Sequence, residues 1–209
     1  MALHPLGIRI QAAGKRYGKQ WILRRRDLEV EPGATLALLG ANGSGKSSLL
    51  RLMCAFDAPT EGSVKWTSNG QSLDAMEVPL VLTYCAPDQS LIPDLTVDEH
   101  LDLHFRLRDA LPEMDVSAAR NLALLPTKGN VRIRELSSGM RQRLSLTLSF
   151  ATSSSAIFLD EPCSHLDQTG RTWYEELVMN WRRDRTLVVA SNHDEQEYPG
   201  VSSRLDLSI

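Results

Sequence analysis

A glycine-rich segment, GANGSGKS from Gly40 to Ser47, has the residue types and spacing of a phosphate-binding loop. Its glycines allow backbone N–H groups to turn inward around phosphate oxygens, and the start of a following helix adds partial positive charge. We expect Lys46 to reach the β- and γ-phosphates, Ser47 to coordinate Mg²⁺ through its hydroxyl, and Ser48 to add a phosphate contact. The candidate nucleotide-binding residues here are Gly40, Asn42, Gly43, Ser44, Gly45, Lys46, Ser47 and Ser48.

The segments on either side of this loop have the character that such a loop requires. The apolar run ATLALL, residues 34–39, predicts a buried parallel strand, and SSLLRLMCAF, residues 47–56, predicts a helix. A glycine-rich turn with a chance lysine is the structural alternative. The strand before the loop and the helix after it favour the phosphate-binding interpretation.

Two acids follow a second apolar run. Asp160 and Glu161 come at the carboxyl end of a strand expected over residues 157–159, where a parallel sheet presents its ligands. We expect Asp160 to hold Mg²⁺, directly or through water, and Glu161 to accept a proton from an attacking water. Paired acids after a strand also cap helices or lie in solvated loops. The phosphate loop upstream favours the catalytic interpretation.

His193 follows a third apolar run, TLVVASN at residues 186–192. A histidine after a strand is usually an ordinary polar terminus. This one is expected at the carboxyl edge of the same sheet, beside the same candidate site.

These motifs, together with LSSGM at residues 136–140, resemble those of ABC-type ATPases, the nucleotide-binding subunits of ATP-binding cassette systems. The resemblance runs from about Ile8 to the C-terminus, and LSSGM carries it most specifically because other phosphate-loop NTPases lack that signature. It implies that GANGSGKS is the Walker A loop, IFLDE (157–161) the Walker B strand and SHLD (164–167) the D-loop. The short form, with LSSGM and the histidine of SNHDEQE, looks most like small bacterial exporter ATPases, including the haem-exporter ATPase of cytochrome c biogenesis.

The resemblance also implies roles for single residues. Tyr17, in the segment KRYG, matches the aromatic residue that stacks on adenine in this family. An aromatic residue that packs on a half-exposed sheet is the structural alternative. His193 matches the switch histidine that senses or steadies the γ-phosphate, and Asp167 matches a D-loop residue that communicates between two subunits.

The signature further implies a head-to-tail dimer around ATP and Mg²⁺. Each ATP would be held between Lys46 and Ser47 of one chain and Ser137 and Gly139 of the other. Residues 138 and 140 differ from the family pattern LSGGQ, whereas the serine and glycine assigned to the γ-phosphate remain. Hydrolysis removes the anion that both halves contact, so the dimer is expected to loosen.

One segment departs from the family pattern. Family members usually carry a glutamine nine residues before the threonine of the LTV-like segment, and Pro87 stands at that position here. Proline offers no side-chain ligand. Asp88 and Gln89 are therefore the candidates to reach the Mg²⁺ or the water in its place.

The motifs predict an α/β fold of the P-loop NTPase class, with a mostly parallel core sheet, an N-terminal antiparallel β-subdomain and an inserted helical subdomain. We expect one domain over residues 1–209, in which 1–90 and 149–209 form the catalytic lobe and 91–148 the insertion with the signature. Within the insertion, Thr96 and Glu99 predict a capping box. Residues 101, 105 and 107–111 predict an apolar face, and VSAARNLALL (116–125) a second helix.

Composition limits the functional classes. A net charge of −3 argues against sequence-independent binding of nucleic acid, and we expect no nucleic-acid partner. Three cysteines without metal-ligand spacing suit a reducing compartment. No run approaches the roughly 20 apolar residues that a membrane span needs, and the first residues do not resemble a signal peptide. We therefore expect a cytoplasmic location, peripheral on the inner face of the plasma membrane.

The leading functional hypothesis is an ATP-hydrolysing subunit of an ABC transporter. It would act as a homodimer or with a paired ATPase subunit, docked through its helical insertion on a separately encoded transmembrane permease subunit. A soluble ABC-type ATP switch acting on nucleic acid or ribosomes is the first alternative, although such relatives usually carry long coiled coils or paired cassettes. The second is an ATP-binding module in which Pro87 has impaired hydrolysis.

Overall fold

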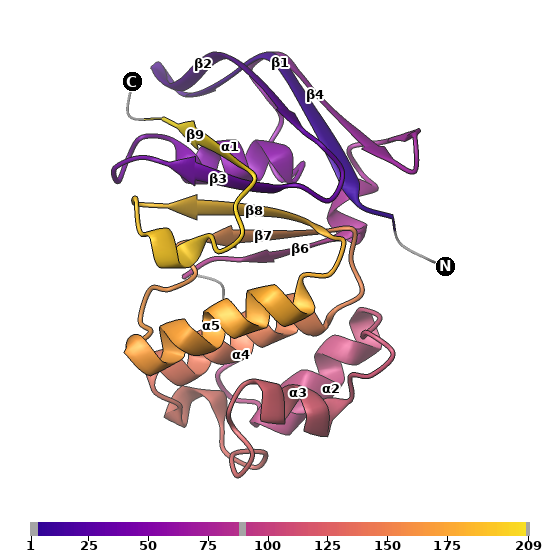
Figure 1. Ribbon diagram of the computed structural model, residues 1–209, viewed down its shortest axis with the longest axis vertical. Coiled ribbons are helices and arrows are strands. Elements are labelled where there is room, and N and C mark those ends of the chain that lie inside the picture. Colours follow the sequence, from indigo (N-terminus) through magenta and orange to yellow (C-terminus); the bar gives the residue numbers. More distant parts are fainter. Residues whose placement is uncertain (1–3, 88–90, 208–209) are drawn as a thin grey trace.

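The computed structural model describes residues 4–87 and 91–207, and within them the chain forms two sheets and a set of helices (Figure 1). The first sheet is antiparallel, in the order β2-β1-β4-β5. The second is parallel throughout, in the order β6-β7-β8-β3-β9. The prediction of a parallel core sheet with an N-terminal antiparallel subdomain is therefore confirmed.

The strands of the antiparallel sheet are β1 (Leu6–Tyr17), β2 (Gln20–Val30), β4 (Glu61–Ser68) and β5 (Gln71–Leu73). Those of the parallel sheet are β3 (Thr35–Leu39), β6 (Leu82–Cys85), β7 (Ala156–Asp160), β8 (Thr186–Ser191) and β9 (Ser203–Asp206). The α-helices are α1 (Lys46–Met53), α2 (Val97–Leu107), α3 (Val116–Leu122), α4 (Ser138–Ala151) and α5 (Gln168–Trp181). Three short 3₁₀ turns among the described residues are η1 (Val78–Leu80), η2 (Ile133–Glu135) and η3 (Glu195–Glu197).

The parallel sheet is covered on both faces, which explains why its strands are continuous apolar runs. Figure 1 shows α1 between the two sheets, and α4 and α5 against the opposite face of the parallel sheet. Successive residues of β3 alternate between these layers: Leu36 and Leu38 pack toward α1, whereas Ala37 and Leu39 pack toward α4 and α5. Every residue of β3, β7 and β8 is buried.

The helical insertion has its own core. Buried residues of α2, α3 and one face of α4 form one apolar cluster, which includes Leu101, Leu144 and Leu148. On another face of α4, Leu146 and Phe150 pack against the parallel sheet instead. Helix α4 therefore joins the insertion to the catalytic lobe, and it continues without a break to Ala151.

The start of α2 follows the predicted capping box. The Thr96 hydroxyl accepts a hydrogen bond from the Glu99 N–H at 3.3 Å, and the Glu99 carboxylate accepts one from the Thr96 N–H at 2.8 Å. The apolar face expected over residues 107–111 is only partly correct. Helix α2 ends at Leu107, whose side chain is exposed, and Leu111 reaches the insertion core from the segment beyond the helix.

Candidate active site

The phosphate loop lies between the carboxyl end of β3 and the start of α1, as the sequence predicts. Gly45 caps α1 in the left-handed backbone region, at φ 98°. A Cβ atom at this position would lie 3.0 Å from Leu23 Cδ2 and 3.1 Å from Ile22 Cγ2 of β2. Both the backbone angle and the close packing on β2 therefore require glycine at position 45.

Lys46 begins α1, and its ammonium group lies over the loop. Its Nζ donates to the carbonyl oxygens of Gly40 at 2.7 Å and Ala41 at 3.1 Å, and the residue is 5% exposed. The hydroxyl of Ser44, in the same loop, is buried and has no hydrogen-bond partner among the described residues. Buried polar atoms are normally hydrogen-bonded, so this hydroxyl fits a loop that receives a polar ligand.

A pocket of about 370 Å³ joins three parts of the chain that are distant in sequence. Its lining includes Tyr17 from the end of β1, Glu161 from the turn after β7, and residues of the phosphate loop and α1. The loop and helix residues that line it are Asn42, Gly43, Gly45, Lys46, Ser47 and Ser48. The tertiary structure thus brings the candidate aromatic, phosphate-binding and acidic residues to one cavity.

Tyr17 lies at the edge of this pocket with a fixed orientation. Its hydroxyl donates to Asp57 Oδ2 at 2.9 Å, and Asp57 also accepts from Arg51 Nε of α1 at 3.0 Å. Burial raises the pKa of Tyr17, and the hydrogen bond to Asp57 raises it further. The ring is half-exposed, at 48%, so it offers apolar surface to a ligand in the pocket.

The two acids at the end of β7 differ in burial and in backbone conformation. Asp160 is the last residue of the strand and is 7% exposed. Glu161 has a left-handed backbone, at φ 45°, and its N–H donates to the Ala190 carbonyl of β8 at 2.9 Å. Such an angle is uncommon for a residue with a side chain and persists only where neighbouring contacts hold it. This turn gives Glu161 a place in the lining of the pocket.

Ser47 and Asp160, the metal ligands expected from the sequence, are too few to complete the coordination of Mg²⁺ by themselves. Within residues 4–87 and 91–207, no group of three or more histidine, cysteine, aspartate or glutamate side chains could hold a metal ion. Mg²⁺ commonly takes one or two protein ligands and completes its shell with phosphate oxygens and water. Ser47 lines the pocket of the candidate phosphate loop and Asp160 ends β7 at the same edge of the sheet, so both stay candidates for such a site.

His193 lies at the same edge of the parallel sheet but does not line the pocket. It follows β8, the strand between β7 and β3, and its backbone is also left-handed, at φ 59°. Its Nε2 atom is 4.0 Å from Asp206 Oδ2 at the end of β9, and both side chains are about half-exposed.

Ser137 and Gly139 lie at the start of α4, outside the pocket formed by their own chain, with Ser137 exposed and Gly139 partly buried. Ser137 caps the helix, and its hydroxyl accepts from the Met140 N–H at 3.2 Å. Gly139 packs against the next loop, where a Cβ atom would lie 3.0 Å from the His165 carbonyl oxygen. The structure therefore does not bring Ser137 and Gly139 to the Lys46 pocket within one chain.

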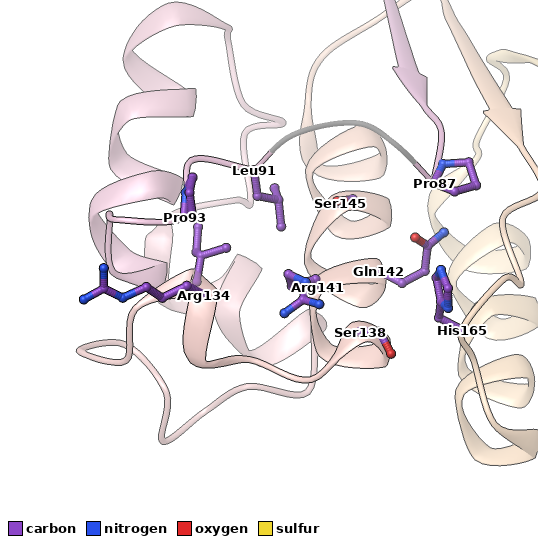
Figure 2. A pocket seen from close by; sticks show the side chains of 10 residues that line it. Pro87, Leu91, Pro93, Arg134, Ser138, Arg141, Gln142, Ser145 and His165 are labelled. Atoms are coloured by element: carbon purple, nitrogen blue, oxygen red, sulfur yellow. The ribbon is translucent and has the colours of Figure 1, made fainter.

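A second cavity, of about 530 Å³, runs along α4, with the segment before α2 and η2 on one side and Pro87 and the loop that leads to α5 on the other (Figure 2). Pro87, just beyond β6, is exposed and lines it. Asp88 and Gln89 lie outside the described residues, so their role stays a prediction. Figure 2 also shows Gln142 extending from α4 toward His165.

Gln142 is a residue that the sequence analysis missed. Its Nε2 donates to the Pro162 carbonyl at 2.8 Å, and the residue is 5% exposed. The bond ties the signature helix to the loop that follows Glu161. Its helical neighbours include Ser138 and Ser145, so no apolar pattern singles it out, and its partner is 20 residues away in sequence. Farther along the same loop, Asp167 caps α5 by accepting from the Gly170 N–H at 2.8 Å.

Comparison with known proteins adds an independent finding. The ABC transporter family model matches residues 23–164. The chain is 31% identical over 202 residues to the phospholipid-transporting ATPase ABCA7 of Homo sapiens, an alignment that covers 93% of this chain and 9% of that protein. It is 29% identical over 180 residues to the aliphatic sulfonates import ATP-binding protein SsuB of Bacillus subtilis (strain 168), covering 86% of this chain and 69% of that protein.

A solved structure has a similar fold. It is the dimeric structure of an ATP-binding cassette in a post-hydrolysis state, bound to ADP and Pi, and it matches with a TM-score of 0.73. The two sequences are 23% identical, and the match covers 91% of this chain and 90% of that one. The chain thus spans nearly a whole cassette of that structure but only a small part of the human relative.

Proposed function

The chain belongs to the ABC transporter family as an ATP-binding domain, and from this membership we propose that it binds and hydrolyses ATP to drive a separate transmembrane subunit. The observation that carries the proposal is the pocket in which Tyr17, the phosphate loop and Glu161 meet. An aromatic ring at one end and backbone N–H groups with a lysine at the other suit a base joined to a chain of phosphates.

The residues of this chain would bind ATP from base to γ-phosphate. Tyr17 would stack on adenine, with its ring held by the bond to Asp57. Lys46 would exchange its bonds to the carbonyls of the phosphate loop for the β- and γ-phosphates. The hydroxyls of Ser44 and Ser48 and the loop N–H groups would complete the phosphate contacts.

Glu161 would act as the general base. Its backbone bond to Ala190 holds the residue in the left-handed turn that gives it a place in the pocket lining. From there its carboxylate would accept a proton from the water that attacks the γ-phosphate. Mg²⁺, held by Ser47 and Asp160, would neutralise charge on the phosphate oxygens. His193 would steady the γ-phosphate from the neighbouring strand.

We further propose that two copies of the domain, or this chain and a paired ATPase subunit, enclose each ATP. The signature serine is exposed and the signature glycine is partly exposed at the start of α4, so a partner's nucleotide can reach them. A helix N-terminus also favours the negative charge of a γ-phosphate. Because both halves would contact that phosphate, its removal would loosen the dimer.

The transmembrane subunit would dock where the insertion meets the catalytic lobe. A cavity of about 330 Å³ lies there, with Phe56 and Tyr84 from the lobe, and His104 and Arg108 from the insertion side, among its lining residues. Leu80, which accepts a weak hydrogen bond from Arg108, is exposed beside it at 72%. Its lining combines apolar side chains with two histidines, hydroxyl groups and one arginine, which suits a short amphipathic segment that carries an acidic side chain.

The location follows from the same proposal. Within residues 4–87 and 91–207, none of the helices has both the length and the apolar character that a bilayer span requires. We propose that the chain lies in the cytoplasm on the inner face of the plasma membrane, held there by its partner.

Replacement of the proposed base tests hydrolysis. Glu161→Gln should lower phosphate release by at least about 100-fold, because the amide cannot accept the proton, while ATP binding is kept. Phosphate release is measured with Mg²⁺ and ATP, and sedimentation velocity is measured in parallel to detect an ATP-bound dimer. Glu175→Gln, on the exposed face of α5, is the matched control and should not differ from the wild type.

Two results would contradict the proposal. If the wild-type chain showed no measurable phosphate release, it would be an ATP-binding module and not an ATPase. A Glu161→Gln variant that turns over ATP as fast as the wild type would exclude this carboxylate as the base.

A further inference from the structure

Glu197 is a buried acid that the proposed hydrolysis does not use. It is 4% exposed and ends η3, the short turn directly after the loop that carries His193. Its Oε1 atom accepts a hydrogen bond from the Cys163 N–H at 3.1 Å. Cys163 lies two residues after Glu161, so this bond connects the loop after β7 to the loop after β8.

The turn that carries Glu197 is fixed on α5. Tyr174, fully buried on that helix, donates its hydroxyl to the Glu197 carbonyl at 2.7 Å. Arg171, about one turn earlier, pairs with the carboxylate of Asp194 and donates to Gln196 Oε1 at 3.3 Å. Asp194 in turn accepts from the Gln196 N–H at 3.1 Å. These bonds fix the turn that carries Glu197, and this turn places the Glu197 carboxylate next to Cys163.

The two loops that Glu197 connects both contain strained residues. Glu161 and His193 have left-handed backbones, at φ 45° and 59°. Such angles are kept only when contacts around them leave no relaxed alternative. The bond from the Glu161 N–H to Ala190 is one such contact, and the bond from Cys163 to Glu197 holds the same turn two residues later.

A simple packing role does not explain a carboxylate at this position. Burying an ionisable group costs free energy unless hydrogen bonds compensate. Burial raises the pKa of Glu197, and hydrogen bonds from Ser191 and Cys163 oppose that rise. These donors come from the end of β8 and from the turn after β7, which are the two segments that present the proposed reacting groups.

We infer that Glu197 is a positioning residue for hydrolysis, because its carboxylate holds the Cys163 N–H and thereby fixes the Glu161 turn against the His193 loop. This inference rests on the proposed function. It predicts a defect in turnover rather than in nucleotide binding, because the phosphate loop is held separately by β3 and α1. A displacement of about 1 Å in a reacting group can lower a rate about 100-fold.

Three variants test the inference. Glu197→Ala removes the acceptor, Glu197→Gln keeps an oxygen in its place, and Glu195→Ala, an exposed residue of the same turn, is the control. We expect Glu197→Ala to lower kcat about 10- to 100-fold, with the Kd for ATP within about twofold of the wild type. We expect Glu197→Gln to recover kcat to within about threefold of the wild type, and Glu195→Ala to leave both constants unchanged.

Several outcomes would overturn the inference. One is a kcat of Glu197→Ala within about threefold of the wild type. Another is a matching loss of kcat and ATP affinity, which would indicate a general structural role. A third is an equal loss in Glu197→Gln and Glu197→Ala, because the charge and not the acceptor would then matter.

A second variant covers the case in which Glu197→Ala does not fold at the assay temperature. Tyr174→Phe removes only the hydroxyl that anchors the Glu197 carbonyl. A several-fold lower kcat with unchanged ATP affinity would support the inference, and an unchanged kcat would overturn it. A wild-type chain without turnover would instead contradict the proposed function, so the two failures are distinguishable.

Discussion

Single residues in this site are placed by backbone angles that few residue types adopt. Gly45 caps α1 at φ 98°, and Glu161 and His193 occupy the left-handed region despite their side chains. The glycine relieves a close approach to β2, whereas the Glu161 turn is held by the hydrogen bond from its N–H to Ala190 of β8. The positions of the candidate functional groups therefore depend on main-chain geometry as well as on side-chain type.

Gly45→Ala is expected to damage both stability and binding. Alanine at this φ is strained, and its methyl group would also press on Leu23 and Ile22, so we expect a loss of about 2–4 kcal/mol in unfolding free energy. Gly70→Ala is the matched control, because Gly70 has φ 72° with open space around it, and it should lose only about 1 kcal/mol. Urea unfolding measures both, and equal losses would argue against tight packing of the loop on β2.

At the scale of elements, the termini of helices position the functional loops. Ser137 is the N-cap of the signature helix α4, Asp167, the last residue of SHLD, is the N-cap of α5, and Thr96 is the N-cap of α2 in the insertion. Each caps its helix by accepting a hydrogen bond from a backbone N–H in the first turn. Each of these residues therefore stabilises the start of its helix, and Ser137 also lies at the proposed dimer interface.

Thr96→Ala should destabilise the insertion by about 1 kcal/mol, because it removes one side of the capping box. Hydrogen bonds from Thr96 lower the pKa of Glu99, so the contribution of that carboxylate is present at neutral pH and is lost as the pH falls through the lowered value. The backbone N–H of residue 96 is the main cause of this lowered pKa and is kept in the variant, so wild type and variant should both lose stability in acid and the difference between them should shrink only slightly. Urea unfolding at several pH values measures this, with Ser117→Ala, an exposed serine of α3, as control.

At the scale of the whole molecule, the candidate site is divided between two surfaces. The phosphate loop and Glu161 line one pocket, and the exposed signature serine Ser137 lies elsewhere on the same chain. Helix α4 connects these surfaces mechanically, because one of its faces packs in the insertion core and another packs against the parallel sheet. The Gln142 bond to Pro162 adds a polar tie between that helix and the Glu161 loop.

Ser137→Arg should block dimerisation and leave nucleotide binding to the monomer intact, because the larger side chain would occupy the exposed tip of α4. The test is sedimentation velocity with ATP in the Glu161→Gln background, together with the Kd for ATP. We expect Ser117→Arg, a matched change on an exposed position of α3, to dimerise normally. A dimer of unchanged stability with Ser137→Arg would exclude the sandwich arrangement.

The local sequence determined much of this molecule. The phosphate loop, the capping box of α2 and the apolar strands that end at Asp160 and before His193 could all be predicted, because each depends on residues within a few positions of one another. The parallel sheet could also be predicted, since continuous apolar runs between helices require burial on both faces. The end of α2 at Leu107 could not, because the turn beyond it is set by packing of Leu111.

Only the tertiary structure decided which distant groups meet. Tyr17 and Glu161 join the phosphate loop because β1, β7 and β3 end near the same cavity, and no short-range pattern encodes that arrangement. The bonds from Gln142 to Pro162 and from Cys163 to Glu197 likewise join residues that are 20 and 34 positions apart. Hydrogen bonds of this range form only after the helices and strands have packed, so their partners become visible only in the folded chain.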